Sequence, residues 1–378
     1  MIVETYKYTN QWDKSFNTDL DSKNTLILIF SSKPCHELQS QVDEITEIFP
    51  DSLITGASTA GEIYQDEVFD DCITVSIVKF ERTKILSISK EVELKDSFQD
   101  GSEMAQQLLA DDLKSVFVLS DGLKVNGSQL TAGINESLPK GIVATGGLAA
   151  DKDKFEKTCI LVDGQLRDGF VNMIGFYGES IQVAYGSKGG WDKLGLERQV
   201  THSKDNIVYE LDGIPALTLY KKYLGDRASG LPATGLLFPL LVQEDKNIDE
   251  SHVRTIIGIN EENNSIIFAG DIPEGSYATL MKANKDRLID GSIGASRMLN
   301  LKKHLDEPIL NIAISCVGRK LVLKQRTEEE LEGCLEVLPK HTKQIGFYSY
   351  GEISLDTSGK CDFLNQTMTL TTLWESHA

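Results

Sequence analysis

Two glutamates that follow glycines are the residues whose type and spacing first suggest chemistry. Glu62 lies in the segment 56–63, which reads GASTAGEI, and Glu352 lies in a similar segment at 346–353, which reads GFYSYGEI. A weaker copy at 142–151 ends in an aspartate. Glycine allows the backbone to approach other groups closely, so each acid is expected beside a tight turn. There a carboxylate either holds a ligand or caps backbone N–H groups, and both interpretations stay open.

Ser58 and Cys316 are the side chains considered as nucleophiles. Ser58 lies between two glycines, but the second glycine of 56–61 comes one residue late for the G-x-S-x-G elbow. Cys316 follows a predicted buried strand, and Arg319 or Lys320 is near enough in sequence to lower the pKa of its thiol. No histidine accompanies either residue in a motif, so both lack a base. An enzyme with a Cys316 or Ser58 nucleophile is therefore the less favoured alternative.

Signatures of several other enzyme classes are absent from the chain. It contains no G-x-x-x-x-G-K-[ST] phosphate loop, no G-x-G-x-x-G after a strand and no H-E-x-x-H. The segment 151–156 begins like a calcium loop but carries Glu156 where the sharp turn requires glycine. The histidines stand outside any motif: His36, His202, His252, His304, His341 and His377. We therefore expect no metal site and no catalytic residue.

Charge and cysteine content narrow the class of protein further. The chain of 378 residues has a net charge of −19, which argues against nucleic acids and anionic membranes because clustered Lys and Arg bind those partners. It shows neither a membrane-spanning apolar stretch nor a signal peptide, so we expect a cytoplasmic protein. The 6 cysteines are scattered without C-x-x-C spacing. We expect them to be reduced thiols, several of them buried as small hydrophobic side chains.

Three stretches of the chain repeat one order of elements that would position these residues. Each has an apolar strand, an amphipathic helix that ends at a proline, a second strand and a glycine turn. The paired strands are expected at 25–30 and 53–57, at 115–119 and 142–145, and at 309–314 and 345–349. The proline precedes the first glycine of the turn by six or seven residues in every case. This regularity predicts structural duplication.

The repeats predict an α/β (α+β) fold of two packed domains, built from strand-helix-strand-hairpin units with mixed sheets. Because residues 186–235 break the pattern, the domains are expected at 1–200 and 201–378. Further helices are expected at 97–113, 215–224 and 278–303, and a capping box is expected at Thr327–Glu330. Further strands are expected at 72–78 with a partner near 85–88, and at 158–163, 169–177, 236–242, 253–259, 265–269 and 367–373.

In this order, the motifs of the chain resemble the FIST domain family, a prokaryotic sensory module with N-terminal and C-terminal parts. The resemblance extends over about residues 20–375. The segments that carry it are 56–63, 146–151, 254–259, 272–276, 315–319, 346–353 and 365–369.

The resemblance implies a cytoplasmic ligand-sensing protein rather than an enzyme. FIST proteins occur alone or fused to histidine kinases, cyclic-dinucleotide enzymes and chemoreceptors, so a separate signalling partner of one of these kinds is implied here. Amino acids or similar small molecules are the proposed ligands of the family. Some members bind haem and sense nitric oxide, and many carry a histidine just before the N-Q-T segment. This chain has Leu364 there, so haem is the weaker expectation.

The resemblance and the motif positions together suggest a ligand site where the two domains meet. Glu62 and Glu352 would face each other across it and pair with an amine, while Arg254 or Arg319 would form a forked contact with a carboxylate. The other residues expected at the site are Ser58, Thr59, Gly147, Cys316, Tyr350, Asn365 and Thr367.

Overall fold

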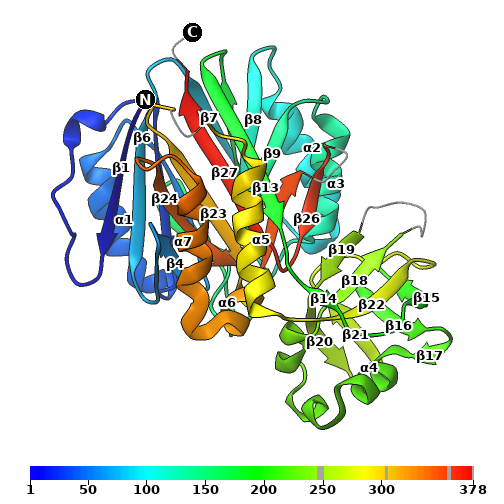
Figure 1. Ribbon diagram of the computed structural model, residues 1–378. Helices are drawn as coiled ribbons and strands as arrows, with labels where there is room; N and C mark the ends of the chain where they lie inside the picture. Colours follow the sequence, from blue (N-terminus) through cyan, green and yellow to red (C-terminus); the bar gives the residue numbers. More distant parts are fainter. Residues whose placement is uncertain (245–250, 303–304, 356–358, 377–378) are drawn as a thin grey trace.

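Three repeated units and a smaller inserted domain make up the computed structural model (Figure 1), which describes residues 1–244, 251–302, 305–355 and 359–376. The first unit contains β1 (Ile2–Tyr8), β2 (Thr25–Ser31), α1 (Cys35–Ile48), β3 (Leu53–Ser58) and β6 (Ile73–Lys79). Strands β2 and β3 are parallel, and β6 runs antiparallel between β2 and β1. The all-apolar β2 is buried on both faces, and the apolar face of α1 packs on the sheet.

The second and third units have the same strand order as the first. The second contains β7 (Lys84–Glu91), α2 (Ser97–Leu108), β8 (Leu113–Ser120), α3 (Gly127–Ser137), β9 (Val143–Leu148) and β12 (Phe170–Tyr177). The third contains β13 (Ile181–Lys188), α5 (Lys285–Met298), β23 (Leu310–Cys316), α6 (Val317–Leu323), α7 (Thr327–Val337), β24 (Lys343–Ser349) and β27 (Met368–Glu375). The predicted α/β (α+β) class, the mixed sheets and the repeated units are confirmed.

Each unit also sends a β-hairpin into the sheet of another unit. The hairpins are β4 (Glu62–Tyr64) with β5 (Glu67–Phe69), β10 (Ile160–Val162) with β11 (Gln165–Arg167), and β25 (Gly351–Leu355) with β26 (Cys361–Leu364). Strand β4 pairs with β24 of the third unit, β25 pairs with β9 of the second, and β10 pairs with β3 of the first. The exchange is cyclic, and it produces three 6-stranded sheets of equivalent order.

The inner faces of the three sheets share one hydrophobic core. Leu28, Phe117 and Ile312 occupy equivalent places on β2, β8 and β23, and all three are buried in that core. Phe30 and Phe347 pack there with ring centroids 4.7 Å apart. Burial of these side chains from water is the main source of stability for the arrangement.

One glycine of each repeated turn is required by close backbone approach. A Cβ at Gly56, Gly146 or Gly346 would lie 2.0, 1.9 or 1.7 Å from a main-chain oxygen of the adjacent parallel strand. Any side chain at these positions would force the two strands apart. The repeated glycine in the sequence therefore reflects sheet geometry.

The inserted domain, which we call the small domain, lies between β13 and α5 in the chain. Its 9-stranded sheet contains β14 (Asp192–Lys193), β15 (Arg198–Lys204), β16 (Ile207–Leu211), β17 (Ile214–Pro215), β18 (Leu240–Gln243), β19 (Ser251–Arg254), β20 (Ile256–Asn260), β21 (Ser265–Phe268) and β22 (Tyr277–Lys282). Helix α4 (Ala216–Leu224) packs on that sheet around a core of its own. Figure 1 shows the small domain at one end of the three units, which together we call the core domain.

Several local expectations differ from the structure. The strand at 84–91 pairs with β12 and not with β6, because it begins the second unit. The expected helix 278–303 is divided into β22 and the shorter α5. Residues 233–237 form a 3-10 helix before β18. Residue 200, where the sequence suggested a domain boundary, lies within β15, so the spatial division of the chain follows the insertion instead.

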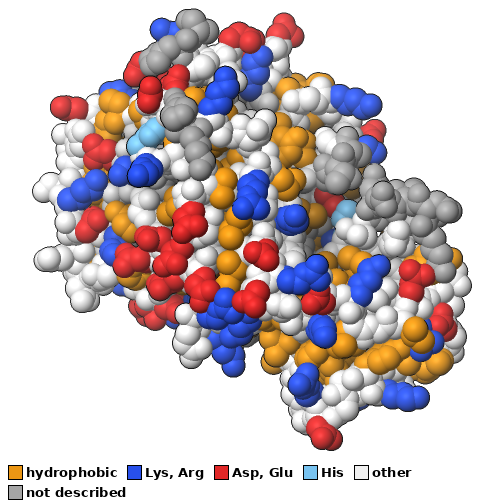
Figure 2. All heavy atoms as spheres, in the orientation of Figure 1, with side chains coloured by type: hydrophobic (Ala, Val, Ile, Leu, Met, Phe, Trp, Pro, Cys, Tyr) orange, Lys and Arg blue, Asp and Glu red, His pale blue; other side chains and the backbone are white. Residues whose placement is uncertain are grey.

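The expected capping box at the start of α7 does not form. The Thr327 hydroxyl donates to the Lys324 carbonyl, and Glu330 is drawn into a buried ion pair. The exposed face of α7 carries Glu328, Glu332 and Glu336. Figure 2 shows acidic side chains gathered over this helix, in keeping with the net charge of −19.

Candidate functional site

The carboxylate of Glu62 is buried at the start of β4 and holds its own hairpin in place. Its Oε1 accepts a hydrogen bond from the Thr59 hydroxyl at 2.5 Å. Its Oε2 accepts bonds from the Cys72 N–H at 3.2 Å and the Ser32 hydroxyl at 3.3 Å. Cys72 directly precedes β6, so this carboxylate connects both ends of the exchanged hairpin. Burial raises the pKa of Glu62 to about 8.

Glu352 makes the equivalent contacts in the third unit. It accepts hydrogen bonds from the Ser349 hydroxyl at 2.7 Å and from the N–H and hydroxyl of Thr367 at 3.1 and 2.9 Å. Burial raises its pKa to about 7. Its partner across the β9–β25 pairing is Gly147, which is buried. The two glutamates therefore sit in separate hairpins with their own partners, and they do not face each other across a pocket.

In the second unit an aspartate that the sequence analysis missed takes over this task. Asp121 follows β8, and its Oδ2 accepts a hydrogen bond from the Gly169 N–H, just before β12, at 3.0 Å. Its Oδ1 accepts bonds from the N–H groups of Leu123 and Lys124. Asp121 follows the first strand of the parallel pair in its unit, whereas Glu62 and Glu352 follow the second strand of theirs. The Gly-Glu pattern therefore does not include it.

Arg319 has an internal partner for its charge. Its guanidinium is fully buried and donates to the Glu330 carboxylate at 2.8 and 3.1 Å. It also donates to the Ser292 hydroxyl at 2.7 Å, while Tyr348 donates to the same glutamate at 2.9 Å. A buried pair with this many hydrogen bonds is a structural element of the third unit. The expected contact between Arg319 and a ligand carboxylate is not supported by this arrangement.

The two nucleophile candidates lie apart and lack a base. Cys316 is buried at the end of β23, and burial raises the pKa of its thiol well above the ordinary value. Ser58 accepts a hydrogen bond from the Cys159 N–H at 2.9 Å. Among the described residues, no histidine or carboxylate is hydrogen-bonded to either side chain. The geometry gives no support to a Cys316 or Ser58 enzyme.

Arg254 and the N-Q-T segment join the small domain to the core domain. Arg254 is buried and donates to the main-chain oxygens of Phe363 at 2.8 Å and Asp271 at 3.2 Å. The Asn365 side chain accepts a hydrogen bond from the Thr255 N–H. The contacts with Phe363 and Asn365 hold the two domains together, whereas the contact with Asp271 lies within the small domain.

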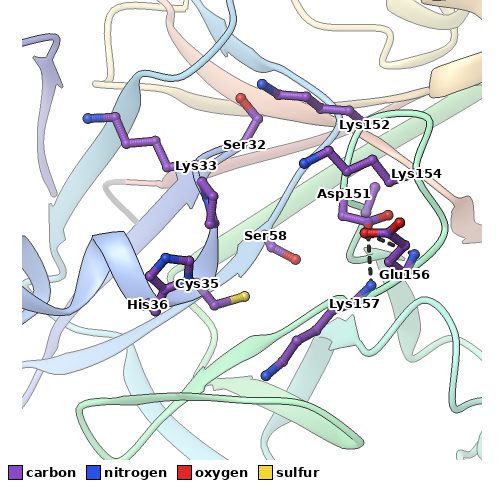
Figure 3. A pocket seen from close by; sticks show the side chains of 12 residues that line it. Ser32, Lys33, Cys35, His36, Ser58, Asp151, Lys152, Lys154, Glu156 and Lys157 are labelled. Carbon is purple, nitrogen blue, oxygen red and sulfur yellow. Dashed lines mark hydrogen bonds between the residues drawn. The ribbon is translucent and has the colours of Figure 1, made fainter.

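A cavity of about 250 Å³, which we call the basic cavity, opens where β2 and β3 end (Figure 3). Ser32, Lys33 and the first residues of α1 form one wall, and Ser58 lies at the centre. The segment 150–157 of the second unit forms the other wall. Its charged lining side chains are Lys33, Lys152, Lys154, Lys157, Asp151 and Glu156. In Figure 3, Lys154 and Lys157 extend from that segment toward the α1 side.

A disulfide between Cys35 and Cys159 joins the two walls of the basic cavity. Cys35 begins α1, and Cys159 directly precedes β10, the strand that the second unit contributes to the first sheet. The expectation of reduced thiols is therefore wrong for this pair. The other four cysteines form no disulfide and are buried: Cys72, Cys316, Cys334 and Cys361.

Asp151 organises the wall of the basic cavity that the second unit supplies. Its carboxylate accepts hydrogen bonds from the backbone N–H groups of Phe155, Glu156 and Lys157 at 2.8–3.0 Å. It also accepts one from the Tyr350 hydroxyl. The Tyr350 ring stacks on Phe155 with centroids 4.3 Å apart, and both line a smaller cavity of about 170 Å³. Segment 151–157 is thus a firmly held loop with cavities on both sides.

A larger cavity of about 560 Å³, the interdomain cavity, lies where the small domain meets the core domain. Its apolar lining residues are Phe155, Pro232, Ala233, Leu236, Leu237, Ile256, Ile257 and Leu321. Its polar side chains are Asp153, Lys154 and Thr234. An apolar pocket with a few convergent polar groups is the usual form of a small-molecule site.

Comparison with known families agrees with this architecture. Residues 25–214 match the FIST N domain, and residues 216–354 match the FIST C domain. The chain belongs to the FIST family. FIST domains are sensory domains that bind small ligands, so a sensory role and small-ligand binding follow for this chain.

An uncharacterized protein of Methanocaldococcus jannaschii is similar to this chain. It is 24% identical over 367 residues, and the match covers 86% of this chain and 69% of the relative. Within the described residues of this FIST protein, no helix is both long and apolar enough to span a membrane.

The linings of the described cavities offer few side chains that serve as axial ligands of haem, with Tyr350 in the cavity of about 170 Å³. The interdomain cavity has no His, Cys, Met or Tyr in its lining, so it offers none of the usual axial ligands. The basic cavity includes His36, but it is small and its other side chains are mainly charged. Leu364 lies in β26, where it pairs with Glu352.

Of the site residues expected from the FIST motifs, Ser58 lines the basic cavity and Tyr350 lines the small cavity beside Phe155. The remainder do not line the cavities described here: Thr59, Glu62, Gly147, Arg254, Cys316, Arg319, Glu352, Asn365 and Thr367. The residues missed by sequence reasoning lie in the charged run 151–157. The alternation of acids and lysines in this run is the signal in the sequence that marks it.

Proposed function

We propose that this FIST protein senses an amino acid with an apolar side chain and binds it in the interdomain cavity. The observation that carries the proposal is the lining of that cavity, which combines an apolar wall with one lysine, one aspartate and one hydroxyl. A zwitterion with a hydrocarbon side chain has the matching set of groups. The FIST family relationship supports a sensory use of this binding.

The two charged side chains are suited to the two ends of an amino acid. Lys154 supplies an ammonium group for the ligand carboxylate, and Asp153 supplies a carboxylate for the ligand ammonium. Neither side chain makes an ion pair with another described residue, so both are available to a ligand. Because they are adjacent in a loop held by Asp151, their spacing is preorganised.

The apolar wall determines the class of side chain that the ligand carries. Leu236, Ile256 and Leu321 come from the small domain and from α6, so a ligand between them contacts both domains. Burying a leucine-sized side chain there contributes about 1.5–3 kcal/mol. A ligand that bridges the two domains stabilises their observed arrangement, and this is the change a partner would detect.

We propose further that the protein acts in the cytoplasm and signals through a separate partner. A histidine kinase, a cyclic-dinucleotide enzyme or a chemoreceptor is the kind of partner that the FIST relationship favours. The test is autophosphorylation or cyclase activity of a co-purified candidate partner with and without the ligand. No change in activity for any candidate partner that binds would contradict this part of the proposal.

Isothermal titration calorimetry with L-leucine, L-phenylalanine and L-glutamate tests the binding. We expect saturable binding of the two apolar amino acids and at least tenfold weaker binding of L-glutamate. Isoamylamine, which lacks the carboxylate, and 4-methylpentanoate, which lacks the amine, should also bind at least tenfold more weakly than leucine. Equal binding of all five compounds, or of none, would overturn the assignment.

A matched pair of variants separates the cavity from the general charge of the protein. Asp153→Asn should weaken leucine binding about tenfold or more, because a charged hydrogen bond contributes about 1.5–3 kcal/mol. Asp111→Asn removes a carboxylate from the exposed turn before β8, outside the cavity lining, and should leave binding unchanged. Equal effects of the two variants would contradict the proposed site.

A further inference from the structure

The basic cavity shares only Lys154 with the interdomain cavity, and its charged lining is largely unneutralised. Lys33, Lys154 and Lys157 make no ion pair with any described residue, whereas Lys152 pairs with Asp71 at 2.6 Å. The Lys33 ammonium lies over the Tyr8 ring at 5.4 Å, whereas Lys154 and Lys157 extend toward the α1 side of the cavity (Figure 3). Two unpaired ammonium groups directed at one cavity stand out in a chain with a net charge of −19. They produce a local positive potential that concentrates anions at this point of the surface.

The start of α1 adds hydrogen-bond donors to the same cavity. Pro34, Cys35 and His36 line it, and α1 extends for 14 residues from Cys35. Its N-cap residue is Pro34, which provides no side-chain hydrogen bond to the first turn. The Glu37 N–H donates to the Pro34 carbonyl at 2.8 Å, so the Cys35 and His36 N–H groups are the ones left for a ligand, and the helix dipole favours a negative charge beside them.

Ser58 supplies a buried donor at the centre of the cavity. It is only 3% exposed, and its Oγ accepts a hydrogen bond from the Cys159 N–H. Among the described residues, no acceptor is hydrogen-bonded to the hydroxyl proton. Buried polar groups are normally hydrogen-bonded. The hydroxyl proton of Ser58 lacks an acceptor among these residues, so it is available to an oxygen atom of a ligand.

The two carboxylates in the lining differ in their hydrogen bonding. Asp151 accepts three backbone N–H groups and the Tyr350 hydroxyl, which disperses its charge. Glu156 makes no side-chain hydrogen bond or ion pair with a described residue. A free carboxylate repels a fully deprotonated anion, but it accepts a hydrogen bond from an anion that still carries a proton.

We propose that the basic cavity binds hydrogen phosphate, either free or as the head group of a small phosphorylated metabolite. Lys154, Lys157 and the α1 amides contact the anionic oxygens, and Ser58 donates to one of them. Glu156 accepts a hydrogen bond from the P–OH group. Sulfate has the same shape and charge but has no proton at neutral pH. The site therefore discriminates hydrogen phosphate from sulfate through Glu156.

Calorimetric titration of the full-length protein with sodium phosphate and with sodium sulfate, at constant ionic strength and pH 7, tests this site. We expect saturable phosphate binding and at least tenfold weaker sulfate binding. Glucose 6-phosphate provides a second arm, because tighter binding than phosphate would identify a metabolite head group. Succinate binding without phosphate binding, or equal binding of phosphate and sulfate, would overturn the proposal.

Three variants localise the effect. Lys157→Gln should weaken phosphate binding at least fivefold, and Lys140→Gln, which removes an exposed lysine from the opposite ends of the strands, should not. Glu156→Gln should reduce the preference for phosphate over sulfate, since the amide can donate to either anion. Lys157→Gln should leave leucine binding unchanged, so this test is independent of the interdomain cavity. Circular dichroism establishes that each variant is folded, and Lys157→Ala replaces Lys157→Gln if that variant is not.

Discussion

At the scale of single residues, two buried glutamates and one buried arginine support the architecture. Glu62 and Glu352 each join the two ends of an exchanged hairpin, and Arg319 neutralises Glu330 inside the third unit. All of them came from motifs that suggested ligand binding in the sequence. The signal was real, but its physical cause is the satisfaction of buried backbone groups at three equivalent turns.

The raised pKa values of the two glutamates predict a particular pH dependence of stability. Burial raises the pKa from 4.5 to about 8 for Glu62 and to about 7 for Glu352. The folded state therefore holds these protons more tightly than the unfolded state, so the contribution is complete below pH 4.5 and is lost as pH rises through the raised pKa values. We expect the free energy of unfolding to fall between pH 5 and 8, by on the order of 3 kcal/mol per glutamate. Urea unfolding across that range measures it.

Glutamine variants provide the control for this prediction. In Glu62→Gln the side chain keeps an acceptor for the Cys72 N–H, and the Thr59 hydroxyl can reverse to accept from the new amide. The fall in stability with pH should become smaller, whereas Glu47→Gln on the exposed face of α1 should leave the slope as it is. An unchanged slope in Glu62→Gln would show that this carboxyl does not titrate in that range.

Breaking the buried ion pair should be costly. Arg319→Met leaves the Glu330 carboxylate buried without its cation, and we expect the free energy of unfolding to fall by about 3–5 kcal/mol. Arg326→Met removes an arginine from a partly exposed pair with Glu329 and should cost at most about 1 kcal/mol. Chemical denaturation of both variants compares the two sites. Equal falls in the free energy of unfolding for the two variants would contradict the expectation that the buried ion pair contributes more than the exposed one.

At the scale of elements, the segment 151–157 and the disulfide define the walls of the cavities. The segment separates the basic cavity from the interdomain cavity, and Lys154 lines both. The disulfide holds α1 against the strand that the second unit inserts beside β3. Both elements connect different repeated units, so each depends on the hairpin exchange.

Opening the disulfide should destabilise the protein. Cys35 and Cys159 are 124 residues apart in the sequence, so the bond closes a long loop in the unfolded chain. Loss of such a bond costs about 2–5 kcal/mol. We expect dithiothreitol to lower the melting temperature of the wild type, measured by circular dichroism. The Cys35→Ser/Cys159→Ser variant should melt at that lower temperature with or without reductant, and a reductant effect in this variant would point to another bond.

The amount of structure that was predictable differs between elements for a physical reason. Strands β2, β3, β8 and β23 were predicted closely, because runs of apolar residues between a turn and a helix are a local signal. The hairpin exchange was not, because its strands are as short as 3 residues and pair with units far away in sequence. Strand β22 was merged with α5 because an apolar strand and an amphipathic helix follow each other without a strong break.

The candidate site was predictable only in part for the same reason. Ser58 was identified because it belongs to a repeated turn. Lys157 and Asp153 were missed because a charged loop has no periodicity, and only the fold brings it opposite α1 and the small domain. The Gly-Glu turns suggested a ligand site because they are repeated. They recur because each glutamate accepts the hydrogen bonds that hold an exchanged hairpin in place.

At the scale of the whole molecule, the cyclic exchange makes the three units interdependent. Each 6-stranded sheet contains strands from two units, and all three sheets share one core. No unit can bury its apolar surface alone.

We therefore expect urea unfolding of the core domain to be a single cooperative transition. The unfolding curves from circular dichroism and from the fluorescence of Trp12 and Trp374, which lie in different units, should coincide. Separate transitions for the two tryptophans would contradict this view.

The central claim is that a FIST sensor of this architecture binds an apolar amino acid between its two domains. A crystal structure of the protein grown with L-leucine tests it most directly. We predict electron density for leucine in the interdomain cavity, with its carboxylate hydrogen-bonded to Lys154 and its ammonium hydrogen-bonded to Asp153. An empty interdomain cavity at saturating leucine, or leucine bound elsewhere on the protein, would contradict the account.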